Sequence, residues 1–162
     1  MDLGISGKTA LVSASSAGLG FASALALAEA GCKTVISGRN EERLMHAASK
    51  IPNSIPVIAD VSTVKGSQAL VQDAKSELGT NIDILITNAG GPPTGTFAST
   101  DVDQYLTAIE LNLMSVVAMC KETVPDMQEK KWGRVLAITS ISVRQPIPNI
   151  MLSNTARAGV TG

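Results

Sequence analysis

The chain has 162 residues, enough for one domain with a single core and too few for two well-formed ones. Hydrophobic residues make up 44% and charged residues 17%, which is typical of a globular protein and excludes a disordered one. The 13 basic and 14 acidic side chains leave a net charge of -1, so charge gives no reason to expect nucleic acid or an anionic membrane as a partner.

Targeting and metal signals are missing from the sequence. The start, MDLGISGKTALVSA, lacks the basic and apolar regions of a secretory signal, and apolar runs such as ILIT are too short to span a bilayer. Cys32 and Cys120 have no CxxC spacing, and His46 is interpreted as a solvated histidine on the surface of a helix. These features predict a reduced, cytoplasmic protein without a metal site.

Short apolar runs alternate with longer stretches of helical period along the chain. This alternation predicts a parallel sheet with helices on both faces, a doubly wound α/β (Rossmann) fold with ligands beyond the carboxyl ends of the strands. We expect strands at 9–14, 33–38, 55–60, 82–90 and 133–140, helices at 18–31, 40–50 and 62–79 (capped by Ser62), an amphipathic region at 101–131, and the start of a helix from about Ile150.

The strand count raises a further expectation. A doubly wound sheet has about six strands, whereas this chain supplies five and then stops at NTARAGVTG. Without a neighbour, the apolar fifth strand would be an exposed edge. We therefore expect residues 1–162 to be a single dinucleotide-binding domain that is shortened at its C-terminus.

The turn SASSAGLG, Ser13 to Gly20, lies where the first strand ends and the first helix begins. Helix N-termini present unpaired N–H groups and a partial positive charge that suit a pyrophosphate. Gly18 and Gly20 allow close approach to the backbone, and the hydroxyls of Ser13, Ser15 and Ser16 add donors. The turn predicts a nucleotide site, although two glycines are a weak fingerprint and ligand-free turns share it. GKT at 7–9 is no phosphate-binding loop, because it enters a strand and Asp2 holds the first glycine position.

Arg39 follows the second strand, nineteen residues after Gly20, in the sequence SGRN. An acid near this position binds a ribose 2′-hydroxyl, whereas a basic residue accommodates a 2′-phosphate. The sequence therefore favours NADP(H) over NAD(H). In isolation, Arg39 is equally well explained as a solvated side chain before a helix.

The ordered set of motifs resembles the short-chain dehydrogenase/reductase family, particularly its members similar to 3-oxoacyl-[acyl-carrier-protein] reductase. SASSAGLG resembles the family's TGxxxGxG, ADV at 59–61 its adenine-binding segment, and TNAG at 87–90 its NNAG motif. The resemblance implies that the cofactor is held by Ser13, Ser15, Ser16, Gly18, Leu19, Gly20, Arg39, Asp60, Val61, Asn88, Ala89 and Gly90.

The resemblance also implies a catalytic set. Asn112 in ELNLMSV matches the family's helix-kinking asparagine, and Ser140 in ITSIS matches its catalytic serine. Where the family has YxxxK, this chain has Ser153 and Arg157, in SNTAR. In the family the tyrosine donates a proton, and the lysine lowers the tyrosine pKa and holds the nicotinamide ribose.

The two substitutions weaken the expected chemistry. Ser153 keeps a hydroxyl that ionises less readily and reaches less far than a phenol, and loss of a positioned general acid costs about 10²–10⁴ in rate. Arg157 keeps a cation for the ribose but cannot give up a proton at neutral pH. From the residues alone, Ser140 could simply end a strand, and Asn112 could satisfy backbone groups in a bent helix.

Three functions remain open from the sequence. The first is an NADP(H)-dependent oxidoreductase that reduces a small carbonyl or oxidises an alcohol at an atypical active site. The second is a catalytically inactive nucleotide-binding sensor or scaffold, and the third is a structural subunit of a mixed oligomer. Relatives pair through two helices, here 101–131 and the one from Ile150, which implies a homo-oligomer, a dimer or tetramer, with no nucleic acid or membrane partner.

Overall fold

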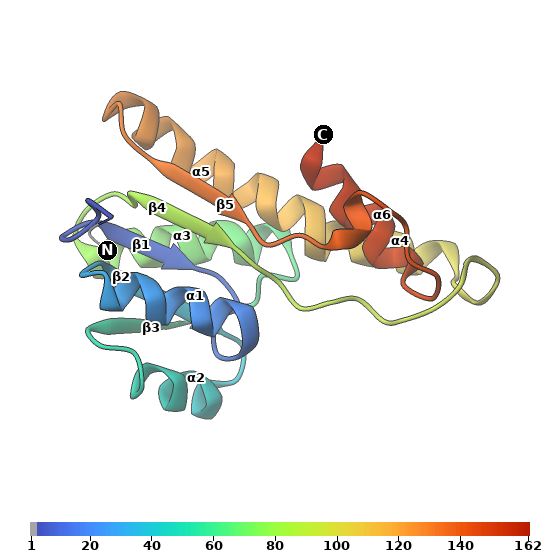
Figure 1. The fold of residues 1–162 in the computed structure, drawn as a ribbon, viewed down its shortest axis with the longest axis horizontal. Coiled ribbons are helices and arrows are strands. Elements are labelled where there is room, and N and C mark those ends of the chain that lie inside the picture. Colours follow the sequence, from blue (N-terminus) through green and yellow to red (C-terminus); the bar gives the residue numbers. More distant parts are fainter. Residues whose placement is uncertain (1–2) are drawn as a thin grey trace.

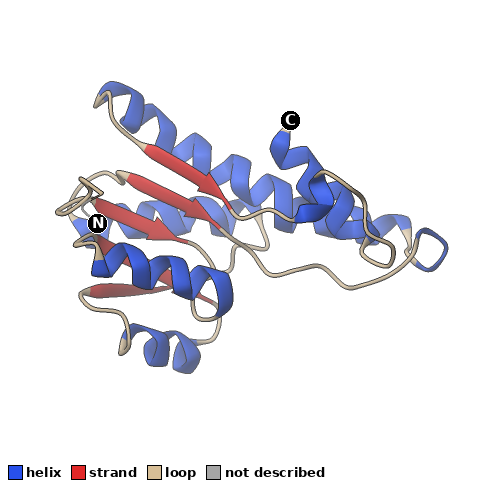
Figure 2. Ribbon diagram, in the orientation of Figure 1, coloured by secondary structure: helices blue, strands red, loops and turns tan. Residues whose placement is uncertain are grey.

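A computed structural model describes residues 3–162 of the chain. Five strands form one sheet in the order β3-β2-β1-β4-β5, and every neighbouring pair is parallel (Figures 1 and 2). The predicted doubly wound α/β fold is confirmed. The strands are Thr9–Val12 (β1), Lys33–Gly38 (β2), Ser54–Ile58 (β3), Ile84–Thr87 (β4) and Arg134–Ala137 (β5).

Helices follow the strands in the predicted alternation. A π-helical turn at Glu110–Met114 joins Val102–Ile109 (α4) to Ser115–Glu129 (α5), so the amphipathic region predicted at 101–131 is one bent helical stretch. The short helix expected from Ile150 is present. The helices are Gly18–Glu29 (α1), Glu41–Ala48 (α2), Val64–Leu78 (α3), Val102–Ile109 (α4), Ser115–Glu129 (α5) and Met151–Thr161 (α6).

The central strands are buried on both faces because helices cover both sides of the sheet, and successive side chains of a strand point to opposite sides. In β1, Leu11 packs with residues of α3 and α5, whereas Ala10 and Val12 pack with residues of α1 and α2. The sheet therefore has two cores, one on each side. The apolar, non-alternating strands predicted from the sequence reflect this double cover.

Local capping sets two of the helix starts. Asn40 Oδ1 accepts a hydrogen bond from the Arg43 N–H at 2.8 Å and begins α2. The prediction that Ser62 caps the third helix was wrong, since Thr63 Oγ1 accepts from the Gly66 N–H at 3.0 Å. The N–H of Ser62 instead donates to Asp60 Oδ1 at 3.0 Å, so the chain makes a turn there before the helix begins.

Strand β5 forms one edge of the sheet. Val135 is 44% exposed and Leu136 is 54% exposed, while every residue of β1 and β4 is buried. Within residues 3–162, no strand lies beyond β5, and its apolar side chains are partly exposed.

The chain reverses its direction across the sheet at β1 and β4. From β1 it continues to β2 and then β3 on one side, and it then returns to β4 and β5 on the other. The crevice outside the carboxyl ends of these two strands is the topological switch point, where open α/β sheets bind ligands. The fold therefore places the glycine-rich turn beside the TNAG segment.

Candidate cofactor and active site

A cleft of about 1060 Å³ lies at this carboxyl edge. It extends from the β1–α1 turn to the first two residues after β5, Ile138 and Thr139, and to Arg157 on α6. It is lined by nine of the residues predicted to bind cofactor (Ser16, Gly18, Leu19, Arg39, Asp60, Val61, Asn88, Ala89, Gly90), by the predicted catalytic Arg157, and by Ala14, Ala17, Gly38, Asn40, Arg43, Ala59, Ser62, Gly91, Thr107, Leu111, Ile138 and Thr139.

The N-terminus of α1 opens onto this cleft. Ala17 precedes the helix, has no side chain that could cap it, and lines the cleft together with Gly18 and Leu19. Gly18 has φ +60°, a left-handed conformation that favours glycine, and no atom lies within 4 Å of where a Cβ would stand. No acidic residue lies in the first helical turn. Unpaired N–H groups of this kind form an anion site.

Three residues predicted to bind the cofactor build the turn and do not line the cleft. Ser15 is buried, donates from Oγ to the Val12 carbonyl at 2.7 Å and accepts from the Ser37 N–H at 2.9 Å. Ser13 is buried and bonded to the Asn88 main chain. A Cβ on Gly20 would lie 2.7 Å from the Ala14 carbonyl oxygen and 2.7 Å from Asn88 Nδ2.

A basic group lies at the β2 end of the cleft. Arg39 Nε is 3.9 Å from Asp60 Oδ1, and both side chains are largely exposed, so the pair contributes little stability. The Ser62 N–H bond, more than the Arg39 charge, holds the pKa of Asp60 below its ordinary value, against an opposing effect of burial. Arg43, four residues after Arg39 in the first turn of α2, also lines the cleft. Arg43 was not among the predicted site residues, although a second basic residue so close to Arg39 in the sequence was a usable signal.

Asn112 lies in the π-helical turn and is buried, with 3% of its surface exposed. Its Nδ2 donates to the Gly90 carbonyl at 2.9 Å, which ties the turn to the segment after β4. Its Oδ1 is buried with no hydrogen-bond partner among the described residues. A buried amide oxygen without a partner is rare and suits an internal water molecule.

The other three predicted catalytic residues lie on two segments, Ser140 just after β5 and Ser153 and Arg157 on α6. Ser140 Oγ accepts from the Ser142 N–H at 3.1 Å and caps the short 3₁₀ turn Ile141–Val143. Its neighbour Thr139 lines the cleft. Ser153 and Arg157 are four residues apart on α6 and so lie on one face of that helix. Asn112, Ser140 and Ser153 stand outside the cleft lining, whereas Arg157 is part of it.

The guanidinium of Arg157 bonds to main-chain carbonyls. Nη1 donates to Ile138 O at 2.7 Å and to Thr139 O at 3.2 Å, and Nη2 donates to Ala89 O at 3.5 Å. Burial lowers the pKa of Arg157 from its ordinary value. The arginine therefore connects α6 with the ends of β4 and β5.

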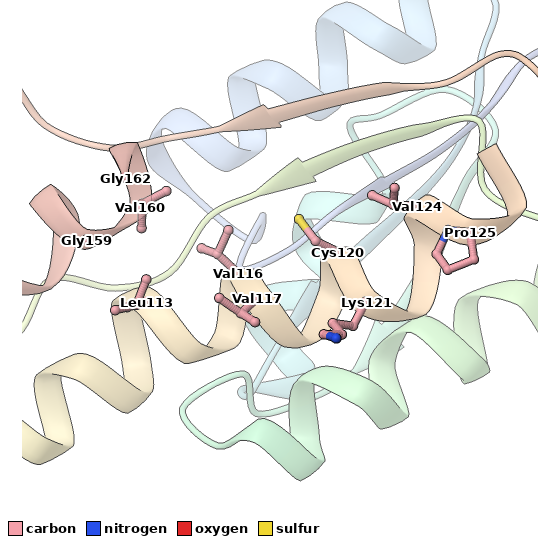
Figure 3. A pocket seen from close by; sticks show the side chains of 10 residues that line it. All are labelled: Leu113, Val116, Val117, Cys120, Lys121, Val124, Pro125, Gly159, Val160 and Gly162. Atoms are coloured by element: carbon pink, nitrogen blue, oxygen red, sulfur yellow. The ribbon is translucent and has the colours of Figure 1, made fainter. Parts of the chain in front are cut away.

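A second cavity has a different character. It measures about 510 Å³ and lies between α5 and the end of α6, where Figure 3 shows the apolar side chains of Leu113, Val116 and Val160 around it. Cys120 lines it, and both Cys32 and Cys120 are free. It has no group of polar side chains that would orient a dinucleotide.

Metal-binding clusters and membrane-spanning helices are absent from the described residues. The described part of the chain holds no group of three His, Cys, Asp or Glu side chains that could bind a metal ion. Within residues 3–162, no helix has the length and apolar character needed to cross a membrane.

The parallel sheet and the cleft at its switch point define a Rossmann-type α/β protein. A family model described as short chain dehydrogenase matches residues 8–162, and the chain belongs to this family of oxidoreductases. The predicted family resemblance is confirmed.

Relatives agree with this assignment. The chain is 34% identical over 152 residues to the uncharacterized oxidoreductase YvaG of Bacillus subtilis, covering 90% of this chain and 56% of the relative. It is 29% identical over 160 residues to the ketoacyl reductase HetN of a Nostoc species, covering 96% of this chain and 55% of the relative. The chain thus spans little more than half the length of these relatives.

Solved structures are similar over nearly the whole chain. The L-sorbose reductase of Gluconobacter frateurii, solved with NADPH and L-sorbose, superimposes with a TM-score of 0.92 at 32% identity, covering 99% of this chain and 62% of that chain. A 7α-hydroxysteroid dehydrogenase solved with NADH superimposes with a TM-score of 0.89 at 27% identity, covering 97% of this chain and 62% of that chain.

Proposed function

We propose that the chain binds NADP(H) in the cleft at the carboxyl edge of the sheet. The observation that carries the proposal is the pairing of an uncapped helix N-terminus with two arginines, Arg39 and Arg43, along one cleft. The α1 N-terminus suits the pyrophosphate, and the arginines suit a 2′-phosphate because guanidinium groups donate several hydrogen bonds to phosphate oxygens. No acid directly follows β2 to select a free 2′-hydroxyl.

The remaining groups fit the rest of a dinucleotide. Asp60 and Val61 line the cleft where the adenine would lie, and Ala89 and Gly90 line it where the adenosine ribose would pass. A relative of the same fold was solved with NADPH and another with NADH, so the family fold accepts both forms. The arginines of this chain favour the phosphorylated form.

We further propose that the protein is an oxidoreductase acting on a small carbonyl or alcohol. A bound nicotinamide cofactor supplies or accepts the hydride. Ser140 would orient the substrate oxygen, Ser153 would supply a hydroxyl, and Asn112 would hold a water molecule through its unpaired Oδ1. Since an aliphatic hydroxyl ionises less readily than a phenol, we expect slow turnover.

One observation favours the alternative, a catalytically inactive nucleotide-binding sensor or scaffold. Arg157, which stands at the family's lysine position, donates to three carbonyls. Those bonds leave fewer donors for a ribose, and Ser153 lacks the phenol of a general acid. Binding and turnover must therefore be measured separately.

Binding is tested by titrating the protein with NADPH and NADH and following cofactor fluorescence. We expect tighter binding of NADPH, and no binding of either form would overturn both functions. Turnover is then measured on a panel of small ketones and aldehydes. Activity that is lost in Ser140→Ala supports the oxidoreductase, whereas an inert protein that still binds NADPH supports the sensor or scaffold.

We also propose a homo-oligomer, a dimer or tetramer, formed through α4, α5 and α6, and a cytoplasmic location. Val117 on α5 is exposed, and the apolar cavity beside α5 and α6 gives these helices a surface that a second subunit could cover (Figure 3). The two free cysteines suit a reducing compartment. Analytical ultracentrifugation tests the oligomeric state, and a monomer at micromolar concentration would contradict it.

A further inference from the structure

The ends of β4 and β5 separate just after their last paired residues. Thr87 and Ala137 are the final register partners, and the Ile138 N–H donates to the Thr87 carbonyl at 2.9 Å. Among the described residues, no main-chain hydrogen bond joins the two strand exits beyond that point. Both exits nevertheless line the cleft, through Ala89 on one side and Thr139 on the other.

Arg157 bridges this separation. Nη1 binds the carbonyls of Ile138 and Thr139, which leave β5, and Nη2 binds the carbonyl of Ala89, which leaves β4. The side chain comes from the middle of α6, so one guanidinium connects three segments that are up to 68 residues apart in sequence. The planar group makes this possible because its N–H donors diverge at fixed angles.

The charge of Arg157 has no acidic partner. The ion pairs of the described residues involve Arg39, Lys75 and Lys130, and none involves Arg157. Carbonyl oxygens alone compensate the half-buried cation. Loss of the guanidinium would remove these donors from the partly buried carbonyls of Ile138 and Ala89, which costs free energy.

We propose that Arg157 is a positioning residue that clamps the exits of β4 and β5 together and so fixes the part of the cofactor cleft that Ala89 and Thr139 line. A lysine cannot replace it, because a single ammonium on a flexible stem lacks the planar fork that reaches diverging carbonyls. The consequence for cofactor binding rests on the proposed function, whereas the clamp itself does not. Substituting the family's lysine in this chain should therefore loosen the cleft.

Amide hydrogen exchange tests the clamp without any cofactor. In Arg157→Lys and Arg157→Gln, peptides covering 88–92 and 138–143 should exchange roughly tenfold faster, the effect of about one lost hydrogen bond. Peptides covering β1 and β2 should be unchanged. Arg144→Lys is the matched control, because Arg144 is exposed in the β5–α6 connection. The same peptides of this variant should exchange at the wild-type rate. Unchanged exchange at both strand exits in Arg157→Lys would overturn the proposal.

Cofactor affinity tests whether the clamp positions the site. NADPH should bind roughly tenfold more weakly to both variants than to wild type, in proportion to one lost bond. Millimolar methylguanidinium should restore the NADPH affinity of Arg157→Ala, whereas methylammonium should not. Global destabilisation of the variant would not produce a difference between the two compounds. Faster exchange with unchanged NADPH affinity would also overturn the proposal. If wild type binds no NADPH, the proposed function fails while the exchange experiment still decides the clamp.

Discussion

Two hydrogen bonds join the Ser13 hydroxyl to the main chain of Asn88 at the ends of the adjacent strands β1 and β4. Ser13 Oγ donates to the Asn88 carbonyl at 2.6 Å and accepts from the Asn88 N–H at 2.8 Å. Asn88 Nδ2 in turn donates to the Ala14 carbonyl at 2.9 Å. These bonds join the exits of β1 and β4 at the switch point. A hydroxyl with its donor committed in this way is not available to a phosphate.

The first prediction separates two serines of the glycine-rich turn. Ser13→Ala should lower the free energy of unfolding by about 1–3 kcal/mol, because it removes both hydrogen bonds between the buried Ser13 hydroxyl and the partly buried main chain of Asn88. Ser16→Ala should leave stability nearly unchanged and weaken NADPH binding, since Ser16 lines the cleft. Urea unfolding and cofactor titration measure the two effects. A stable Ser13→Ala with weak NADPH binding would return Ser13 to a phosphate-binding role.

The second prediction concerns close packing at Gly20. Gly20→Ala should destabilise the protein by about 1–3 kcal/mol, the usual effect of forcing a methyl group into a packed site. A Cβ there would meet the Ala14 carbonyl and Asn88 Nδ2, both at 2.7 Å. Gly91→Ala is the control, since no atom lies within 4 Å of its Cβ position. Equal urea midpoints for the two variants would contradict the packing argument.

The third prediction concerns cofactor preference. Arg39→Ala should weaken NADPH binding by about tenfold or more, the effect of one charge-assisted bond of about 1.5–3 kcal/mol. NADH binding should change far less, because NADH has no 2′-phosphate. Arg43→Ala should act in the same direction. Equal losses for the two cofactors in Arg39→Ala would count against a contact between Arg39 and the 2′-phosphate.

The fourth prediction concerns the buried carboxylate of Asp83. Burial acts to raise the pKa of Asp83, but hydrogen bonds from Lys130 Nζ and the Thr9 N–H and the nearby positive charges outweigh it, so the pKa is lowered. A lowered pKa stabilises the fold above the unfolded value near 3.9, and this stability is lost as the pH falls through the folded value. Asp83→Asn should lower the free energy of unfolding by about 1–3 kcal/mol at pH 7.

The difference in the free energy of unfolding between wild type and Asp83→Asn should become smaller as the pH falls below about 4, where the carboxylate of the unfolded chain is protonated. Chemical denaturation at a series of pH values measures it. Asp73→Asn is the control, because Asp73 is exposed on α3. A pH-independent difference for Asp83→Asn would mean that the charge of Asp83 does not stabilise the fold.

Much of the fold was predictable because its signals are local. Buried parallel strands leave apolar runs, and helices leave a 3.6-residue period, so five strands and their order of helices were expected correctly. The ends of the strands were predicted less well, since the strand predicted at 82–90 forms only over Ile84–Thr87. The predicted cap of α3 was wrong because Ser62 and Thr63 both carry a hydroxyl that can cap a helix. Only the turn at Asp60, seen in the structure, selects Thr63.

The sequence by itself determined the fold class, the family and the segments that surround the cleft, because spacing and residue type along a strand–turn–helix unit suffice for these. Only the tertiary structure decided which side chains remain free for a ligand. Ser13 and Ser16 look alike in SASSAGLG, yet Asn88, which lies 75 residues from Ser13, occupies one hydroxyl and leaves the other at the cleft. Arg157 likewise reads as a substitute for a lysine until its three carbonyl partners are seen. Hydrogen-bond capacity is consumed by neighbours in space, and those neighbours are distant in sequence.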